Sequence, residues 1–84
     1  MPSVEGVGPK ALLEFVVKSL VDNPGEVYVE EVNHPNETVL ELSVAGPDMG
    51  RVIGKSGRVI NAIRALIQVA AAKEGMQVSV EIIE

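Results

Sequence analysis

The segment GKSG, residues 54–57, places two glycines, a lysine and a serine in four consecutive positions. Glycine accepts backbone angles and close approaches that a Cβ hinders, so such a turn can expose main-chain N–H groups to a ligand. Lys55 adds a positive charge, and Ser56 adds a small hydrogen-bonding group. The pattern of a helix follows, and a helix N-terminus favours anions because its first N–H groups lack partners. Phosphate is the anion that this combination favours.

The charge distribution supports contact with phosphate at this turn, although the whole chain has a formal net charge of −5. Residues 49–73 contain five basic and no acidic residues, whereas the rest contains two lysines against twelve acids, a local charge of −10. Proteins contact phosphate through Lys and Arg, so we expect the phosphate contacts on residues 49–73. The acidic remainder of the chain should repel phosphate. The five basic residues are Arg51, Lys55, Arg58, Arg64 and Lys73, of which we expect Arg64 and Lys73 to be solvated.

Hydrophobic periodicity predicts one small α+β domain in which six elements position the turn. The expected elements are a helix over 9–22, hairpin strands over 26–32 and 38–45, a short helix over 49–53, a helix over about 57–74 and a strand over 77–83. Asp48 is expected to cap the short helix. The expected apolar stripe of the long helix consists of Val59, Ile60, Ile63, Leu66, Ile67 and Ala70. Because two helices connect the second and last strands, these strands should be parallel, which predicts a mixed sheet.

Composition excludes several classes of protein. The 84 residues include no cysteine and a single histidine, so neither a disulfide framework nor a metal site is expected. Glu14 and Lys18 interrupt the apolar run near the N-terminus, which argues against a signal peptide or membrane span and favours the cytoplasm. No catalytic constellation is evident, so we expect a protein that is not an enzyme and needs no cofactor. Residues 1–8 are expected to form a flexible N-terminal segment.

A nucleotide-hydrolysing P-loop is one alternative, because residues 54–56 match the end of G-x-x-x-x-G-K-[ST]. The spacing does not fit: the leading glycine of that motif would fall on Met49, and Gly50 leaves the loop one residue short. The turn is also expected after a helix rather than after a strand. These differences disfavour a P-loop.

The longer run VIGKSGRVINAI, residues 52–63, resembles the V-I-G-x-x-G-x-x-I-x-x-I signature of the KH domain. This RNA-binding module clamps about four backbone nucleotides with its G-x-x-G loop. The element order resembles the type II arrangement, α-β-β-α-α-β, over residues 9–83. The small size and the segment LLEFVVKSLVDNPGEVYV are similar to the bacterial single-KH-domain family KhpA. That resemblance implies a three-stranded mixed sheet covered on one face by three helices.

The KhpA resemblance also implies a function and a site. Members of this family bind RNA, self-associate or pair with a larger KH-domain protein, and are linked to RNA regulation and cell envelope growth. We therefore expect a single-stranded RNA-binding protein that acts as an RNA chaperone or post-transcriptional regulator. The implied RNA-backbone contacts are Gly54, Lys55, Ser56 and Gly57, with Arg51 and Arg58 as neighbouring phosphate partners. The implied base groove has Val52, Ile53 and Ile60 as candidate wall residues and the strand near Val78 on its other side.

Two alternative interpretations stay open at this stage. The GKSG segment could be an ordinary connection between helices, with Gly54 ending the first of them and the neighbouring apolar residues packing in the core. The fold could also serve mainly as a module for homodimer or heterodimer formation, because a scaffold can keep its architecture while its function moves to another surface.

Overall fold

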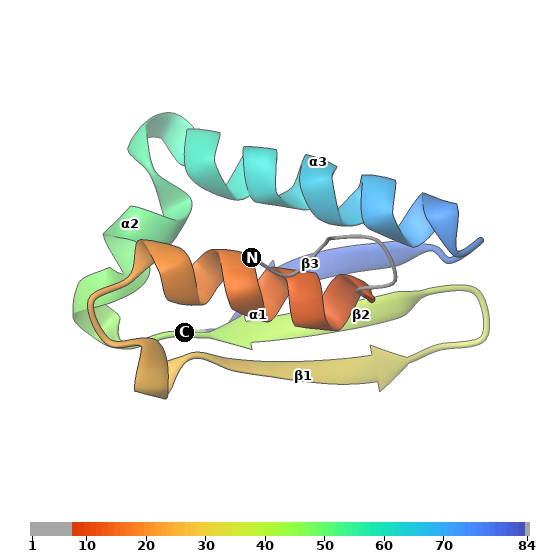
Figure 1. The fold of residues 1–84 in the computed structure, drawn as a ribbon, viewed down its shortest axis with the longest axis horizontal. Helices are drawn as coiled ribbons and strands as arrows, with labels where there is room; N and C mark the ends of the chain where they lie inside the picture. The colour runs from red at the N-terminus through yellow and green to blue at the C-terminus, as the bar shows by residue number, and fades with distance from the viewer. Residues whose placement is uncertain (1–7, 84) are drawn as a thin grey trace.

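A computed structural model describes residues 8–83 and shows three α-helices against one face of a three-stranded sheet (Figure 1). The regular elements are α1 (Pro9–Leu20), β1 (Tyr28–Asn33), β2 (Thr38–Ser43), α2 (Met49–Ile53), α3 (Arg58–Lys73) and β3 (Val78–Ile82). Short 3₁₀ turns lie at Pro24–Glu26, Gly46–Asp48 and Lys55–Gly57. The expected α+β class and element order are confirmed.

The sheet has the order β1-β2-β3 and combines two directions of pairing. The hairpin strands β1 and β2 pair antiparallel, with Tyr28 opposite Ser43. β2 and β3 pair in parallel, from Thr38 opposite Val78 to Leu42 opposite Ile82. The mixed sheet is therefore confirmed, and β3 forms one of its edges.

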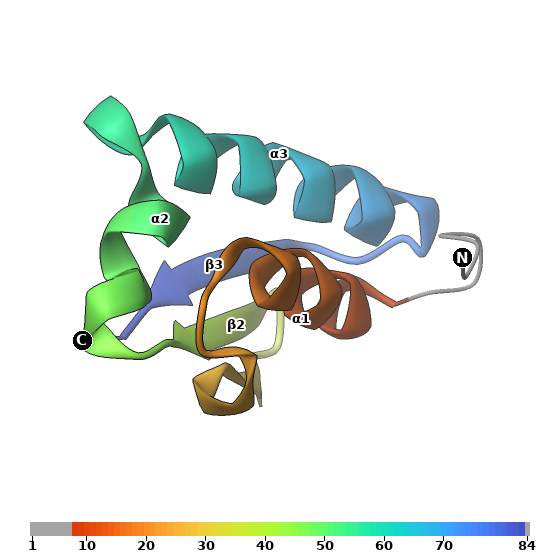
Figure 2. The same ribbon diagram turned by 60° about the vertical axis from the view of Figure 1, so that its left-hand side comes forward.

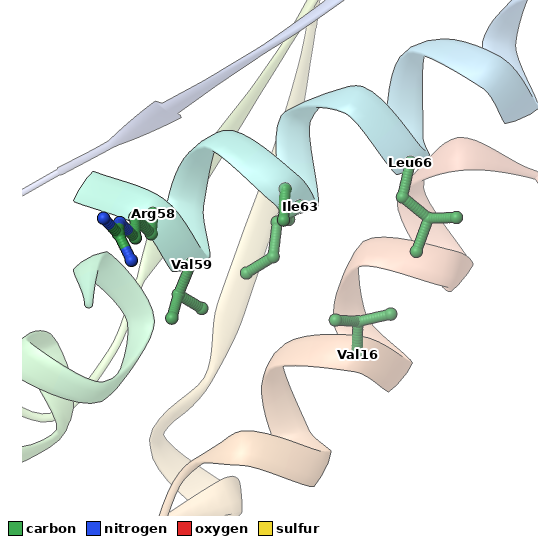
Figure 3. Close-up of a pocket in the computed structure, with 6 residues that line it drawn as sticks. Val16, Arg58, Val59, Ile63 and Leu66 are labelled. Atoms are coloured by element: carbon green, nitrogen blue, oxygen red, sulfur yellow. The ribbon is translucent and has the colours of Figure 1, made fainter. Parts of the chain in front are cut away.

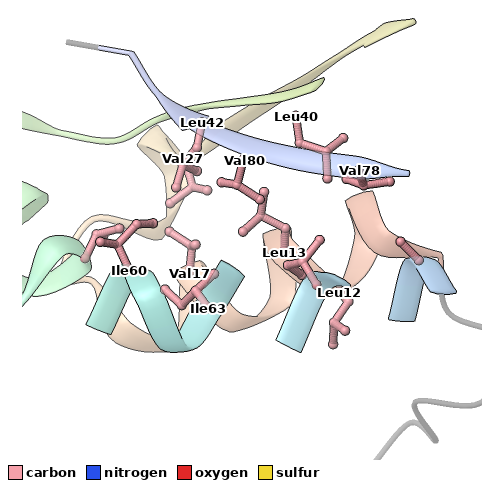
Figure 4. Packing of buried hydrophobic residues seen from close by; sticks show 13 residues of the cluster. Leu12, Leu13, Val17, Val27, Leu40, Leu42, Ile60, Ile63, Val78 and Val80 are labelled. Atoms are coloured by element: carbon pink, nitrogen blue, oxygen red, sulfur yellow. The ribbon is translucent and has the colours of Figure 1, made fainter. Parts of the chain in front are cut away.

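The core lies between the sheet and the helices (Figure 4). α1 and α3 contribute buried residues at three- and four-residue spacing, because this spacing keeps side chains on one face of a helix. In β2 the buried residues alternate with partly exposed ones, as expected for a strand with one covered face. Each fully buried Val, Leu or Ile side chain stabilises the fold by about 1.5–3 kcal/mol relative to exposure. The buried apolar residues are Leu12, Leu13, Val17, Val27, Leu40, Leu42, Val52, Ile60, Ile63, Ile67, Ala71, Val78 and Val80.

The observed ends of the elements differ slightly from the expected ones. α1 ends at Leu20 rather than at residue 22, because Val21 already has extended backbone angles. The expected flexible segment 1–8 lies, apart from Gly8, outside the described residues. Within residues 8–83, no helix combines the length and the apolar character needed to cross a bilayer.

Candidate nucleic-acid interface

The GKSG turn is the connection between α2 and α3, and it projects at one end of the molecule (Figure 2). Gly54 ends α2 by donating its N–H to the carbonyl of Gly50 at 2.9 Å. Three of its four residues have positive φ angles: +74° at Gly54, +57° at Ser56 and +74° at Gly57. Lys55 and Ser56 are exposed at the tip. The turn therefore presents its backbone to solvent in an unusual, glycine-dependent conformation.

Gly54 is required by a close approach of the two helices. A Cβ at this position would lie 2.4 Å from Cγ2 of Val59 and 2.9 Å from the Val59 main-chain nitrogen. Gly57 differs, since its hypothetical Cβ would meet nothing closer than 3.8 Å. The shape of the turn thus depends on one glycine for space and on both for backbone angles.

The main-chain N–H groups at the tip are available to a ligand. Gly57 donates to the carbonyl of Gly54 at 3.2 Å, whereas the N–H groups of Lys55 and Ser56 have no main-chain acceptor within residues 8–83. The N–H groups of Lys55 and Ser56 lie just before the 16-residue helix α3, whose N-terminus carries partial positive charge. Two N–H donors, the Lys55 ammonium and the helix dipole together favour an anion here.

The apolar residues expected to form a groove wall lie mostly inside the protein. Val52 is fully buried, Ile60 is 5% exposed and Val78 is 8% exposed, and all three belong to the core. Ile53 is half-buried and packs against that core. Val52 and Ile60 lie on the buried faces of their helices, and Val78 lies on the covered face of strand β3, so all three contribute to the core.

The two arginines beside the turn have different surroundings. The guanidinium of Arg51 lies 3.4 Å from the carboxylate of Asp22 in an exposed ion pair. Arg58 lines a shallow groove between α1 and α3 (Figure 3). Asp22 lowers the positive potential at Arg51, but an exposed ion pair of this kind is weak, and the Arg51 side chain stays accessible to solvent.

Asp48 does not cap α2, contrary to the expectation from the sequence. Its side chain makes no capping hydrogen bond and is 1% exposed. Its carboxylate accepts three hydrogen bonds: from the main-chain N–H of Asp22 at 3.2 Å, and from the main-chain N–H and Nδ2 of Asn23 at 3.0 Å each. Asp48 therefore ties the segment after α1 to the start of α2, the helix that carries the glycine turn.

The pKa of the Asp48 carboxyl reflects this network. Burial by itself raises the pKa, because it disfavours the charged form. The hydrogen bonds from Asn23 and Asp22 and the nearby charge of Arg51 outweigh burial and hold the pKa below its ordinary value of 3.8. Asp48 is therefore ionised at neutral pH.

Arg64 is not the solvated residue that its place on a helix suggested. It is half-buried, and its Nε donates a hydrogen bond to the main-chain carbonyl of Val80 at 3.2 Å. This contact joins α3 to the edge strand β3. Sequence reasoning missed it because the two residues are 16 positions apart and no motif relates them.

The groove between α1 and α3 has a volume of about 340 Å³. Leu66, expected in the buried stripe, is 44% exposed, and Val69 nearby is 60% exposed. Figure 3 shows Leu66 of α3 extending toward Val16 of α1. The lining residues are Val16, Arg58, Val59, Ala62, Ile63 and Leu66. One flank of α3 thus presents apolar side chains to solvent.

No cluster of three or more His, Asp or Glu side chains in residues 8–83 is placed to hold a metal ion.

The fold and the glycine turn define a KH domain of the type II order. The family model described as "KhpA/KhpB, KH domain" matches residues 10–82. "RNA-binding protein KhpA" of Clostridium acetobutylicum is 57% identical over 74 residues, covering 88% of this chain and 99% of the relative. Its namesake in Chlamydia caviae is 45% identical over 75 residues, covering 89% and 96%. The chain belongs to the KhpA/KhpB family of KH domains.

Two solved structures share the fold at low sequence identity. A crystal structure of Aquifex aeolicus Era superposes with a TM-score of 0.62 at 20% identity, covering 88% of this chain and 29% of Era. A structure of Era in complex with MgGDPNP and nucleotides 1506–1542 of 16S ribosomal RNA gives a TM-score of 0.57 at 19% identity, covering 88% and 28%. The chain thus spans under a third of either Era chain, and the likeness concerns the fold alone.

Proposed function

We propose that this protein binds single-stranded RNA and acts in the cytoplasm as an RNA chaperone or post-transcriptional regulator, a binding function rather than a catalytic one. The observation that carries the proposal is the exposed GKSG turn before α3, where the main-chain N–H groups of Lys55 and Ser56 have no main-chain acceptor among residues 8–83. The relatives named as RNA-binding proteins support it. Gly54, Lys55, Ser56 and Gly57 hold the phosphate backbone in this proposal.

The geometry favours a few phosphate contacts rather than an aromatic binding platform. The chain has a single phenylalanine and a single tyrosine, so it cannot stack several bases on aromatic side chains. Affinity then comes largely from phosphate contacts, and the logarithm of the binding constant should fall with the logarithm of salt concentration by about 0.7 per contact. An isolated copy should bind weakly and with a modest salt slope.

The double substitution Lys55→Asp, Ser56→Asp tests the proposal. It places two negative charges where phosphate is expected, and we expect RNA affinity to fall by at least about tenfold. Aspartate tolerates the positive φ of Ser56 better than most residues, and both sites are exposed, so the fold should persist. Fluorescence anisotropy with labelled single-stranded RNA at low and moderate salt measures binding, and circular dichroism checks the fold.

The chain contains a matched control in a second Lys-Ser pair. Lys18 and Ser19 are exposed on α1, and Lys18→Asp, Ser19→Asp changes the net charge by the same amount. We expect this variant to bind RNA nearly as well as the wild type. Equal loss in both variants would attribute the effect to total charge, and unchanged binding by the loop variant would place the site elsewhere.

We also propose that the protein self-associates through the groove between α1 and α3 or uses it to pair with another KH-domain protein. The exposure of Leu66 and Val69 beside this groove supports that role, because exposed apolar side chains gain free energy when a partner covers them. Association would also link two RNA sites and raise their combined affinity. The GKSG turn lies outside this groove, so the two functions are compatible.

The double substitution Leu66→Gln, Val69→Gln is expected to weaken self-association by at least about tenfold, since it removes apolar area from the interface without adding charge. Sedimentation equilibrium over a range of protein concentrations measures the change. Tyr28→Gln is the control, because Tyr28 is 66% exposed on β1, away from the groove. A variant that dimerises as strongly as the wild type would contradict self-association through this groove. A wild type that stays monomeric would contradict self-association itself and leave only the pairing with another KH-domain protein.

A further inference from the structure

The hairpin strand β1 is an edge strand, and within residues 8–83 no strand pairs with its outer side. The main-chain N–H of His34 donates to the carbonyl of Glu37 at 2.8 Å, just beyond the last pair of the hairpin. Hydrogen-bonded and non-hydrogen-bonded pairs alternate along antiparallel strands, so the even-numbered residues of β1 exchange their bonds with β2. Leu42, which lies opposite Val29, accordingly accepts its hydrogen bond from the β3 side. The N–H and C=O groups of Val29 and Glu31 therefore point outward, where an added strand can bond them.

The face of the sheet that the helices leave open carries a row of negative charge (Figure 1). The register places Glu30 of β1 opposite Glu41 of β2, and Glu41 opposite Glu81 of β3. Adjacent strands lie about 4.8 Å apart, so the carboxylates of such a row repel one another. The three strands contain no lysine or arginine, and neither ion pair of residues 8–83 involves a strand glutamate. This row therefore repels RNA and attracts a cationic group.

A hollow of about 520 Å³ lies along the same edge. Its lining includes the four consecutive residues of the segment 28–31, together with Glu41 and Ser43 of β2. Successive residues of a strand point to opposite faces, so an added segment can place side chains on both sides of the sheet here. Tyr28 is 66% exposed on the open face, where its ring can accept a cation. Lys10 of α1 also lines the hollow, and α1 covers the opposite face.

We propose that the β1 edge binds an extended segment of another protein that carries a basic residue at every second position. The main chain of this segment pairs with the outward N–H and C=O groups of Val29 and Glu31. Its basic side chains lie on the open face beside Glu30 and Tyr28. The side chains between them lie on the face that α1 covers, where Lys10 disfavours further positive charge. This association is separate from RNA binding and does not depend on it.

The charges of the chain disfavour a second copy as the occupant of this edge. Two paired β1 strands would bring Glu30 and Glu31 of one copy close to the same residues of the other, and like charges on adjacent strands repel. The basic segment of the chain, residues 49–73, is mostly helical in α2 and α3, so it is not an extended strand that could pair there. The complementary partner is therefore a basic segment of a different protein.

The test uses a short labelled peptide that alternates arginine and valine, and an isomer in which the arginines form one block. Fluorescence anisotropy should show that the wild type binds the alternating peptide with a Kd below about 1 mM, and at least about threefold more tightly than the isomer. The double substitution Glu30→Gln, Glu41→Gln should weaken binding of the alternating peptide by about fivefold, because two exposed ion pairs are lost. Circular dichroism checks the fold.

Glu37→Gln, Glu74→Gln is the matched control, because both residues are exposed, lie outside the lining of the hollow and change the net charge equally. It should alter the Kd by less than about twofold. Hydrogen exchange followed by NMR locates the contact: the N–H groups of Val29 and Glu31 should exchange more slowly when the peptide is bound.

Four outcomes would overturn the proposal: no binding of the alternating peptide by the wild type, equal binding of the two isomers, equal loss in both glutamine variants, or binding that leaves the exchange of Val29 and Glu31 unchanged. Protection of these two N–H groups that rises with protein concentration alone would assign the edge to a second copy instead.

Discussion

Replacing Gly54 with alanine is expected to destabilise the domain by about 3 kcal/mol or more. The backbone at Gly54 has φ +74° and ψ 173°, a region open essentially to glycine, and forcing another residue there costs about 1–3 kcal/mol. The new Cβ would also lie 2.8 Å from Cβ of Val59 and 2.9 Å from its main-chain nitrogen, and such overpacking typically costs a further 1–3 kcal/mol or so. Small domains are stable by only about 5–15 kcal/mol, so this is a large part of the total.

Two other glycines provide a matched series for this measurement by urea unfolding. Gly57→Ala has the same positive φ but ordinary contacts, and should cost about 1–2 kcal/mol. Gly50→Ala lies within α2 with nothing within 4 Å of its Cβ, and should be neutral or stabilising by up to about 1 kcal/mol. If Gly54→Ala cost no more than Gly57→Ala, the close approach of Gly54 to Val59 would be contradicted.

Asp48→Asn is expected to lower the melting temperature by roughly 10 °C, a large effect for a nearly isosteric change. Three N–H donors from Asp22 and Asn23 converge on the two carboxylate oxygens of Asp48. An amide replaces one of these acceptors with a donor, which leaves at least one N–H facing another N–H in a buried site. Thermal unfolding followed by circular dichroism at neutral pH measures the loss.

The pH dependence of stability provides a second readout for Asp48. Its folded pKa is below 3.8, so near and below that pH the unfolded chain binds more protons than the folded one. The stabilisation is therefore complete above the ordinary pKa and is lost as the pH falls toward the folded value. Asp48→Asn should show a flatter stability profile below about pH 5 than the wild type.

Asp22→Asn is the control for this comparison. Its side chain is 70% exposed, and within the described part of the chain its carboxylate forms an ion pair only with exposed Arg51. The loss of this ion pair should therefore change stability by less than about 1 kcal/mol. A wild-type melting temperature in Asp48→Asn, or an equal effect in both variants, would contradict the role of Asp48 as the link between the end of α1 and the start of α2.

The class of fold and the position of the glycine turn could be predicted from the amino-acid sequence. Hydrophobic periods of about 3.6 and 2 distinguish helices from strands, and the two-helix connection requires β2 and β3 to be parallel. The turn could also be predicted locally, because glycine adopts positive φ angles more readily than other residues, and both glycines of the turn do so. These features depend on neighbours along the chain, and the sequence contains them directly.

The contacts between side chains of different elements could not be predicted from the sequence and became visible in the folded structure. Asp48 bonds to Asn23 over a separation of 25 residues, and Arg64 bonds to Val80 over 16. Leu66 shares the helical spacing of the core residues, yet it is exposed beside the α1–α3 groove. Periodicity gives the apolar side of a helix, whereas the angle and distance at which that helix packs decide which residues at the margin are covered. Those quantities arise from the whole core, so no local pattern encodes them.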